Sequence, residues 1–388
     1  MRSIRIIHAA DLHLDSPFQA LSAAKASVRR EEQGELLAAL AALAADESAD
    51  LMLLSGDLLD SGNTYHETGE ALLRSLASVP CPVFIAPGSH DCWTERSPWA
   101  RLDLPENVHV FHENAVHFVS GPSADARVYG AAFTDRNAPA LLRGFHAERR
   151  AGVYNLLCLH GEVGNPDSLC NPISSEDLAA SGIDYAALGH MHNASGLQRS
   201  GNTWYAWPGC AEGHGFDECG EKTVNIVELD GEDARLRTAC IASRRYETLE
   251  LDISDRDPLL LIHTSLPDDT VRDIYRITLT GEAESAPDLR KLHQNLDEMF
   301  FALELRDKTL LRRDIWDSAA EDSLRGLFLR RLRARFDAAR DDSERDRIVQ
   351  AARWGLAALD TAGEGCVHDQ PSTAGLVRET AERQSAPA

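Results

Sequence analysis

The stretch Pro82-Val83-Phe84-Ile85-Ala86-Pro87-Gly88-Ser89-His90-Asp91 decides the fold of this chain. Its apolar first part is typical of a buried strand, and the Pro-Gly pair at 87–88 predicts a tight turn that ends the strand. Three polar side chains then follow at the carboxyl end of that strand, which is the edge where open α/β sheets hold their sites. Taken alone, the same arrangement is also typical of an ordinary turn.

Two earlier segments repeat the order of apolar strand, polar loop and helix. Residues 4–8 form a β-branched run that leads into Asp11-Leu12-His13, and residues 51–54 form an apolar run closed by Ser55-Gly56-Asp57. Helical patterns follow these loops over 21–45 and 66–77. Residues 1–91 therefore predict a βαβαβ unit with a largely parallel sheet.

Later apolar runs end in histidines. Residues 154–159 close on His160-Gly161, and residues 185–188 close on Gly189-His190-Met191-His192. Short alternating runs between residues 108 and 133 predict strands added to a second sheet. Apolar runs over 223–229 and 234–241 predict a closing hairpin.

The sequence changes character after about residue 245. Residues 246–253 and 274–279 are strand-like, and residues 286–296 are helix-like. Further on, dense mixed charge is interleaved with apolar residues at helical intervals, and the end of the chain has no periodicity. The sequence therefore predicts a main domain over 1–245, a small α/β capping module over 246–309, amphipathic helices over 310–360 and a disordered tail over 361–388.

Composition restricts the kind of protein. The net charge of −23 argues against a surface that coats nucleic acid through general basicity. The eight cysteines contain no CxxC pair, which favours reduced thiols over a disulfide framework or a zinc knuckle. No run approaches the roughly 18 apolar residues that a membrane span needs, and the chain enters a strand directly. We therefore expect a cytoplasmic protein without a membrane partner.

The strand ends together offer enough carboxylates and imidazoles for two metal ions. The candidate residues are Asp11, His13, Asp57, Ser89, His90, His160, His190 and His192. Oxygen and nitrogen donors together suit manganese, iron or zinc. Without cations, so many acids and imidazoles at one edge would repel one another or stay unsatisfied.

The spacing of these candidates also indicates a reaction. Asp-x-His and His-x-His let two side chains of one segment reach the same ion, and Asp57, alone on its loop, is the expected bridge between two ions. Two metals about 3.5–4 Å apart clamp a phosphoryl oxygen and activate water. The sequence therefore predicts in-line attack on a phosphoester.

The five loop motifs resemble the signature blocks of the calcineurin-like metallophosphoesterase superfamily. The resemblance spans roughly residues 1–245 and implies a four-layer α/β/β/α sandwich. It implies that one metal is held by Asp11, His13, Asp57 and His192, and the other by Asp57, the residue at position 89, His160 and His190. It leaves His90 free to stabilise the transition state or to protonate the leaving oxygen.

Within that superfamily, the runs 6–17 and 207–218 are similar to the SbcD-type DNA repair exonucleases, in particular to a YhaO-like bacterial branch. This resemblance implies a nuclease that uses two divalent ions, Mn²⁺ first and Fe²⁺ or Zn²⁺ as alternatives. It also implies a capping module after the phosphoesterase domain, and C-terminal helices that dock on the coiled coil of an SMC-like ATPase. The expected partners are DNA and that ATPase, and a homodimer is expected from the family.

One ligand position departs from the superfamily pattern. Ser89 stands where the superfamily has asparagine, and a hydroxyl is a shorter and weaker metal donor than an amide oxygen. We therefore expect a loosened second metal site. Because the aspartates and histidines of the pattern are all present, we still expect hydrolysis.

Three functions remain open on the sequence alone. A manganese-dependent DNA nuclease subunit is favoured by the cap-like module and the charged helices. A phosphoesterase acting on small phosphoesters or phosphoproteins would use the same metal core. A non-catalytic scaffold that binds DNA ends and an ATPase is suggested by Ser89.

Overall fold

The computed structural model describes residues 2–62, 64–119, 125–283, 285–311 and 315–364. The chain divides into two units, the first made of residues 1–281 and 287–308 and the second of residues 282–286 and 309–388. Of the tail for which the sequence predicts disorder, residues 365–388 lie outside the described residues.

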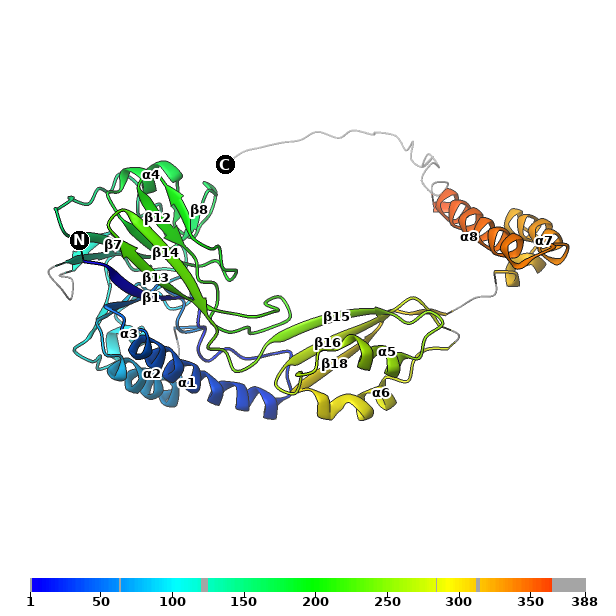
Figure 1. Ribbon diagram of the computed structural model, residues 1–388, viewed down its shortest axis with the longest axis horizontal. Coiled ribbons are helices and arrows are strands. Elements are labelled where there is room, and N and C mark those ends of the chain that lie inside the picture. Colours follow the sequence, from blue (N-terminus) through cyan, green and yellow to red (C-terminus); the bar gives the residue numbers. More distant parts are fainter. Residues whose placement is uncertain (1, 63, 120–124, 284, 312–314, 365–388) are drawn as a thin grey trace, which may run out of the picture. The chain divides into compact units, whose positions relative to one another are not determined.

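A mixed six-stranded sheet contains the N-terminal strand of the first unit (Figure 1). Its order is β14-β13-β1-β2-β3-β4, in which β1 to β4 are parallel and β13 is antiparallel to both of its neighbours. The bounds are Ile4–Ala9 for β1, Leu51–Leu54 for β2, Val83–Ile85 for β3, Val108–Val110 for β4, Val224–Asp230 for β13 and Asp233–Ala239 for β14. The parallel strands β1, β2 and β3 confirm the predicted βαβαβ unit.

A second six-stranded sheet has the order β11-β12-β10-β7-β6-β5. Its bounds are His117–Val119 for β5, Ala126–Gly130 for β6, Tyr154–His160 for β7, Tyr185–Gly189 for β10, Gln198–Ser200 for β11 and Thr203–Ala206 for β12. A separate two-stranded pair consists of β8 (Glu162–Val163) and β9 (Pro172–Ile173).

The structure corrects one prediction about the second sheet. Strand β4 pairs in parallel with β3 of the first sheet, with Val83 opposite Val108, and only the later runs β5 and β6 join the second sheet. An alternating run has the same local pattern in either sheet, so tertiary pairing alone decides which sheet it joins.

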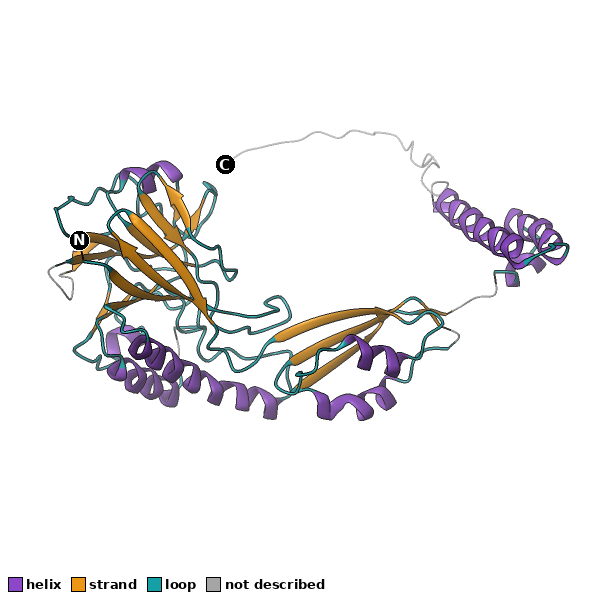
Figure 2. Ribbon diagram, in the orientation of Figure 1, coloured by secondary structure: helices purple, strands orange, loops and turns teal. Residues whose placement is uncertain are grey.

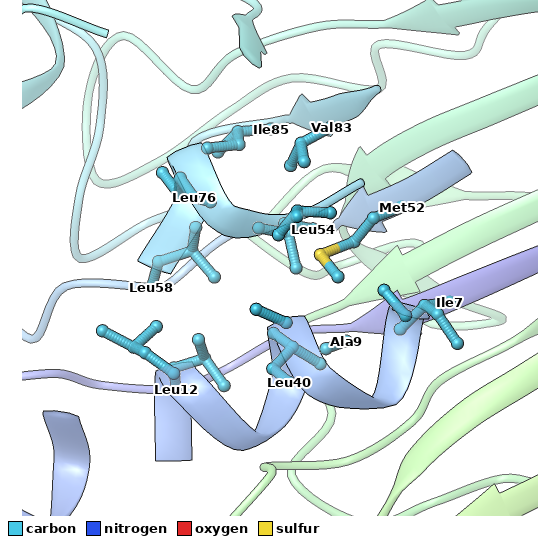
Figure 3. Packing of buried hydrophobic residues seen from close by; sticks show 14 of the residues in the cluster. Ile7, Ala9, Leu12, Leu40, Met52, Leu54, Leu58, Leu76, Val83 and Ile85 are labelled. Atoms are coloured by element: carbon cyan, nitrogen blue, oxygen red, sulfur yellow. The ribbon is translucent and has the colours of Figure 1, made fainter. Parts of the chain in front are cut away.

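Three apolar clusters define four layers, as expected from the sequence (Figure 2). Between the sheets, the first sheet contributes Ile4, Ile6 and Leu53, and the second contributes Tyr154, Leu156 and Tyr185. On the outer face of the first sheet, strand residues pack against α1 (Ala23–Asp46) and α2 (His66–Ser78), as Figure 3 shows for Ile7, Met52, Leu54, Ile85, Leu40 and Leu76. Leu178 of α4 (Ser175–Ala180) packs on the outer face of the second sheet.

Strand β1 is buried on both faces because it lies inside its sheet. Ile6 faces the second sheet and Ile7 faces the helices, as the two-residue period of a strand requires. His8 is fully buried on the Ile6 side, where its Nδ1 lies 2.8 Å from the Tyr185 hydroxyl. Burial lowers the pKa of His8 to about 3, so this ring is neutral.

Side-chain caps explain where several helices begin. The Ser22 hydroxyl accepts a hydrogen bond from the Lys25 amide at the start of α1. The Ser174 hydroxyl accepts from the Asp177 amide at the start of α4. Such caps satisfy amides that have no partner within the helix. A short helix, α3 (Pro98–Arg101), follows the β3 loop.

The C-terminal part of the first unit is a small α/β module. Its three parallel strands have the order β15-β16-β18, with bounds Tyr246–Asp252, Ile274–Thr280 and Ala302–Asp307. The connections contain α5 (Pro258–Ser265), α6 (Leu289–Leu296) and the 3₁₀ turn η1 (Asp297–Met299). The strand-like runs and the helix predicted after residue 245 correspond to β15, β16 and α6, whereas α5 and β18 were not predicted.

A buried ion network joins α1 to the start of this module. Arg29 of α1 is fully buried and donates to Glu32 at 2.6 Å and to Glu212 at 2.7 Å. Arg244 donates to Glu32 at 2.9 Å, and its guanidinium lies 3.6 Å from the centroid of the Phe301 ring. Buried arginine requires such carboxylate partners, so these contacts fasten the helix to the module.

The second unit is mainly helical. It contains the pair β17 (Glu282–Ala283) and β19 (Leu310–Leu311), the 3₁₀ turn η2 (Asp317–Ala320) and the helices α7 (Leu324–Asp337) and α8 (Asp342–Glu364). Residues 310 and 311 form a strand rather than the start of the predicted helices. Among the described residues, no helix has both the length and the apolar character that crossing a membrane requires.

Candidate metal centre

The candidate ligands follow four strands that end at a common edge of the sandwich. Asp11 and His13 follow β1, Asp57 follows β2, His160 ends β7, and His190 and His192 follow β10. Because β1 and β2 are parallel neighbours, as are β7 and β10, each pair of strands brings its carboxyl ends together. Backbone hydrogen bonds from Asp11 to Gly56 and from His13 to Asp57, both 3.0 Å, hold the first two loops against each other.

Asp11, His13 and His192 form a first cluster, whose ligand atoms lie within 4.8 Å of one another. The Nε2 atoms of His13 and His192 are 3.2 Å apart. The Nδ1 atom of His13 lies 3.2 Å from Asp60 Oδ1, and Nδ1 of His192 contacts the Glu218 carboxylate. A carboxylate accepts hydrogen bonds, so each Nδ1 carries the hydrogen and each Nε2 presents a lone pair to the other. Two facing lone pairs fit a cation between them.

Asp11, Asp57 and His160 form a second cluster by the same distance criterion. His160 is fully buried, and its Nδ1 donates to the Ser55 carbonyl at 2.9 Å. Its Nε2 lies 3.3 Å from Asp57 Oδ2, yet it makes no hydrogen bond among the described residues. Asp11 belongs to both clusters. A buried nitrogen acceptor beside two carboxylates fits a second cation.

The buried charges at this edge perturb one another. Burial raises the pKa of Asp11 to about 7. Burial alone would also raise the pKa of Asp57, but the charge and hydrogen bond of His160 hold it well below the usual range of a carboxyl. Burial would lower the pKa of His160, but Asp57 outweighs this effect and raises it to about 9. The two clusters thus concentrate charge that divalent ions can balance.

The Ser89 hydroxyl is directed to a carboxylate. Ser89 Oγ donates to Asp57 Oδ2 at 3.0 Å, and the backbone amide of His90 donates to Asp57 Oδ1 at 2.8 Å. Ser89 is part of neither cluster. The residue at this position therefore supports Asp57 in the structure, whereas the sequence predicted it as a direct ligand.

His90 lies beside the first cluster and is exposed. Its ring centroid is 4.7 Å from that of His13, and its Nδ1 lies 3.1 Å from the Asp60 carbonyl oxygen. The carbonyl accepts the hydrogen of Nδ1, which leaves Nε2 as the ring nitrogen that is free to approach a bound molecule.

His190 lies next to the second cluster but is not part of it. Its ring centroid is 5.3 Å from that of His160, and its backbone amide donates to both Asp11 oxygens at 3.1 Å. Burial lowers the pKa of His190, so the ring is available as a neutral donor. The structure thus brings the predicted aspartates and histidines to one edge, with His190 and Ser89 at the margin of the clusters.

The backbone of the ligand loops has an unusual conformation. Asp11, His13, Asp57 and His190 have φ angles of 52°, 41°, 51° and 96°. L-residues other than glycine adopt this left-handed region rarely, and such strain clusters at functional sites. Gly189 meets a different constraint, because a Cβ atom there would collide with the Ser55 carbonyl oxygen. The ends of the two sheets are therefore in direct backbone contact at the site.

Asp91 holds three of the loops together and was not assigned a role from the sequence. It is fully buried, and its carboxylate accepts from the amides of Gly88 at 2.7 Å, Leu58 at 2.9 Å and Asp57 at 3.2 Å. Asp60, Glu218 and His214 were also missed as supporting residues. The signal for Asp60 and Asp91 was their place inside the quoted motifs, whereas nothing local marks Glu218.

An open cleft of about 540 Å³ adjoins the first cluster. It is lined by residues 16–20, residues 214–218 and Arg276 of β16. His214 and Glu218 therefore lie between the cleft and the cluster, and a molecule in the cleft would lie close to the candidate ligands.

Comparison with known proteins agrees with this geometry. Residues 4–194 match the model of the calcineurin-like phosphoesterase family. The chain belongs to this family through a segment that contains every candidate ligand, and its four-layer fold is the expected one. Members of the family use divalent metals, so the class of the protein is a metal-dependent phosphoesterase.

Individual relatives are more distant. The chain is 28% identical over 271 residues to the metallophosphoesterase YhaO of Bacillus subtilis, covering 66% of this chain and 64% of YhaO. It is 24% identical over 290 residues to the SbcD component of the nuclease SbcCD of the same organism, covering 62% and 70%. It is 24% identical over 268 residues to the DNA double-strand break repair protein Mre11 of Aeropyrum pernix, covering 65% and 64%. The match thus spans less than two thirds of YhaO and of Mre11.

Proposed function

We propose that this protein is a two-metal phosphodiesterase that cleaves DNA and works as a nuclease subunit with an ATPase. The observation that carries the proposal is the approach of His13 Nε2 to His192 Nε2 within 3.2 Å beside Asp11, with Asp57 and His160 next to them. Two relatives support DNA as the substrate, since they are named as a component of a nuclease and as a DNA double-strand break repair protein.

The donor atoms fit two divalent cations. In this proposal one is held by Asp11, His13, His192 and Asp57, and the other by Asp57, His160 and His190, with Ser89 as a weak further donor. The bound ions supply Lewis acidity toward a phosphoryl oxygen and an activated water. Mn²⁺ is the proposed ion, because mixed carboxylate and imidazole donors suit it as well as iron and zinc.

His90 is the proposed catalytic acid. It is exposed beside the first cluster, and the Asp60 carbonyl fixes its Nδ1–H. In the protonated ring, Nε2–H can donate to the leaving oxygen or stabilise charge that develops on the phosphate. Asp57 orients this residue, because its carboxylate accepts the His90 backbone amide at 2.8 Å.

The second unit is the proposed site of ATPase docking. Its helices carry dense mixed charge and three exposed apolar side chains, Leu324, Leu327 and Trp354, of which Trp354 is 75% exposed. Exposed aromatic and aliphatic side chains among charged ones are typical of interaction surfaces. Because the chain carries a net charge of −23, we propose that an SMC-like partner supplies much of the grip on DNA.

The proposal is tested with the full chain on two substrates, linear duplex DNA and the small diester bis(p-nitrophenyl) phosphate. We expect Mn²⁺-dependent cleavage of both, lost in Asp57→Asn and in His90→Gln. Glu232→Gln is a matched control, because Glu232 is exposed in the β13–β14 turn, away from the clusters.

Other outcomes separate the alternatives. Cleavage of the small diester without any cleavage of DNA would overturn the nuclease and favour a phosphoesterase of small phosphoesters or phosphoproteins. Absence of metal binding would overturn both enzymes and favour a scaffold, an alternative to which the contact between Ser89 and Asp57 lends some support.

A further inference from the structure

Glu218 binds two histidines at once beside the first cluster. One carboxylate oxygen accepts from Nδ1 of His192, and the other accepts from Nδ1 of His214 at 3.0 Å and from the His214 amide at 2.8 Å. Glu218 is only 8% exposed. Both of its oxygens are therefore occupied by N–H donors of the protein.

The contact with Glu218 decides which nitrogen of His192 can bind a metal. Because a carboxylate only accepts hydrogen bonds, Nδ1 of His192 must carry the hydrogen, and Nε2 keeps its lone pair. That lone pair faces His13 Nε2 at 3.2 Å. With hydrogen on Nε2 instead, the ring could not ligate an ion on this side.

His214 extends the connection to the loop after β1. Its Nε2 donates to the Leu12 carbonyl at 3.1 Å, and Leu12 stands between Asp11 and His13. The His214 ring also stacks on Phe18, with 5.8 Å between the centroids. A continuous path thus runs from the Leu12 carbonyl through His214 and Glu218 to His192.

A direct role of Glu218 as a ligand is the competing explanation, because His192, Cys210 and Glu218 also place ligand atoms within 4.8 Å of one another. Three hydrogen bonds to Glu218 argue against it. The Cys210 thiol is buried and donates to the His192 carbonyl at 3.5 Å, so it too supports the His192 segment.

We propose that Glu218 is a positioning residue of the metal centre, which fixes the ligating tautomer of His192 and, through His214, couples this ligand to the loop that carries Asp11 and His13. The inference rests on the proposed two-metal function. It assigns a role to a residue that lies 26 positions beyond His192 in the sequence and outside the family match, which ends at residue 194.

The test measures metal binding by the full chain. Isothermal titration with Mn²⁺ should resolve two sites in the wild type. Glu218→Gln keeps the size of the side chain but can no longer accept from both histidines. We expect it to retain two sites while one of them binds about 10–100-fold more weakly, the range typical for loss of a residue behind a metal-ligating histidine. Glu232→Gln should change neither site.

A spectroscopic readout separates positioning from general structural support. With Co²⁺ in place of Mn²⁺, the visible absorption of the weakened site should shift in Glu218→Gln. His214→Gln, which keeps the Glu218 contact with His192, should shift affinity at the same site by less. This second variant also tests the inference if Glu218→Gln does not fold.

Three results would overturn the inference. Unchanged affinity at both sites in both variants would make Glu218 a bystander. Loss of one entire site in Glu218→Gln would make it a direct ligand. If the wild type itself binds no metal, the proposed function fails and the inference falls with it, whereas the first two results leave the proposed function intact.

Discussion

His8 and His160 are both fully buried, and in both rings Nε2 makes no hydrogen bond among the described residues. An oxygen holds Nδ1 in each case, from the Tyr185 hydroxyl for His8 and from the Ser55 carbonyl for His160. Burial lowers the pKa of His8 to about 3. For His160 the same burial is outweighed by Asp57, which raises the pKa to about 9. A converging carboxylate, rather than burial, therefore distinguishes a histidine of the metal centre from a histidine of the core.

The strongest test of this comparison removes the carboxylate. In Asp57→Asn, His160 should become like His8, with a pKa below the usual value of about 6.5 in a histidine NMR titration of the metal-free protein. Because a buried charge loses its partner, we expect the free energy of unfolding to fall by about 3–5 kcal/mol. Cleavage of phosphodiesters should be lost.

The control for this variant is Asp167→Asn, which changes an exposed aspartate outside the clusters. An Asp57→Asn protein with unchanged stability and an unchanged pKa of His160 would contradict the ion pair and break the comparison.

His90 extends the comparison to an exposed histidine. Its substitution in His90→Gln should lower kcat by about 10²–10⁴-fold, the usual contribution of a general acid, because no ring nitrogen remains to donate a proton. Mn²⁺ affinity, measured by titration calorimetry, should not change. His112→Gln serves as a control at another exposed histidine. A parallel loss of Mn²⁺ affinity would instead make His90 a ligand.

The core histidine predicts a dependence of stability on pH. His8 stays neutral in the folded protein down to about pH 3, whereas in the unfolded chain it gains a proton below about 6.5. The unfolded state therefore binds more protons as pH falls, and His8 costs about 1.4 kcal/mol of stability for each pH unit below about 6.5.

The variant His8→Gln should remove this part of the pH dependence while keeping an acceptor for the Tyr185 hydroxyl. The measurement is urea unfolding of wild type and variant at about pH 7.5 and about pH 5.5, on either side of the usual histidine pKa. Equal differences at the two pH values would show that His8 titrates in the folded protein, contrary to the comparison.

The smallest expected effect concerns the second ion. Ser89→Asn supplies an amide oxygen, which is a better donor than the hydroxyl that now bonds to Asp57. We expect Mn²⁺ affinity at the weaker site to rise by about tenfold, with a corresponding gain in turnover at low Mn²⁺. The matched change Ser265→Asn, in an exposed residue at the end of α5, should have no effect. No gain in Ser89→Asn would mean that other donors already complete this site.

Much of the site could be predicted from the sequence because each ligand loop directly follows an apolar strand. The runs that became β1, β2, β7 and β10 are marked by local pattern, and parallel pairing then brings their carboxyl ends to one edge. Chemistry alone selected carboxylates and imidazoles as metal donors.

The remaining features depend on contacts that no local pattern records. Strand β4 joined the first sheet because it pairs with β3, and an alternating run carries no information about its partner. Glu218 lies in a loop without periodicity, and only the fold brings it to His192. The hydroxyl of Ser89 could be predicted to be a poor donor, but its orientation toward Asp57 depends on the turn at 87–88.

The contact between the two sheet ends has a consequence for biosynthesis. The His190 amide donates to Asp11 across 179 positions of sequence, and Gly189 lies against the Ser55 carbonyl. The ligand set does not exist until translation has passed His192, which takes about 10–40 s at the usual rate of roughly 5–20 residues per second. A nascent chain therefore carries separate acidic and imidazole loops, and only the completed sandwich offers an ion its full coordination.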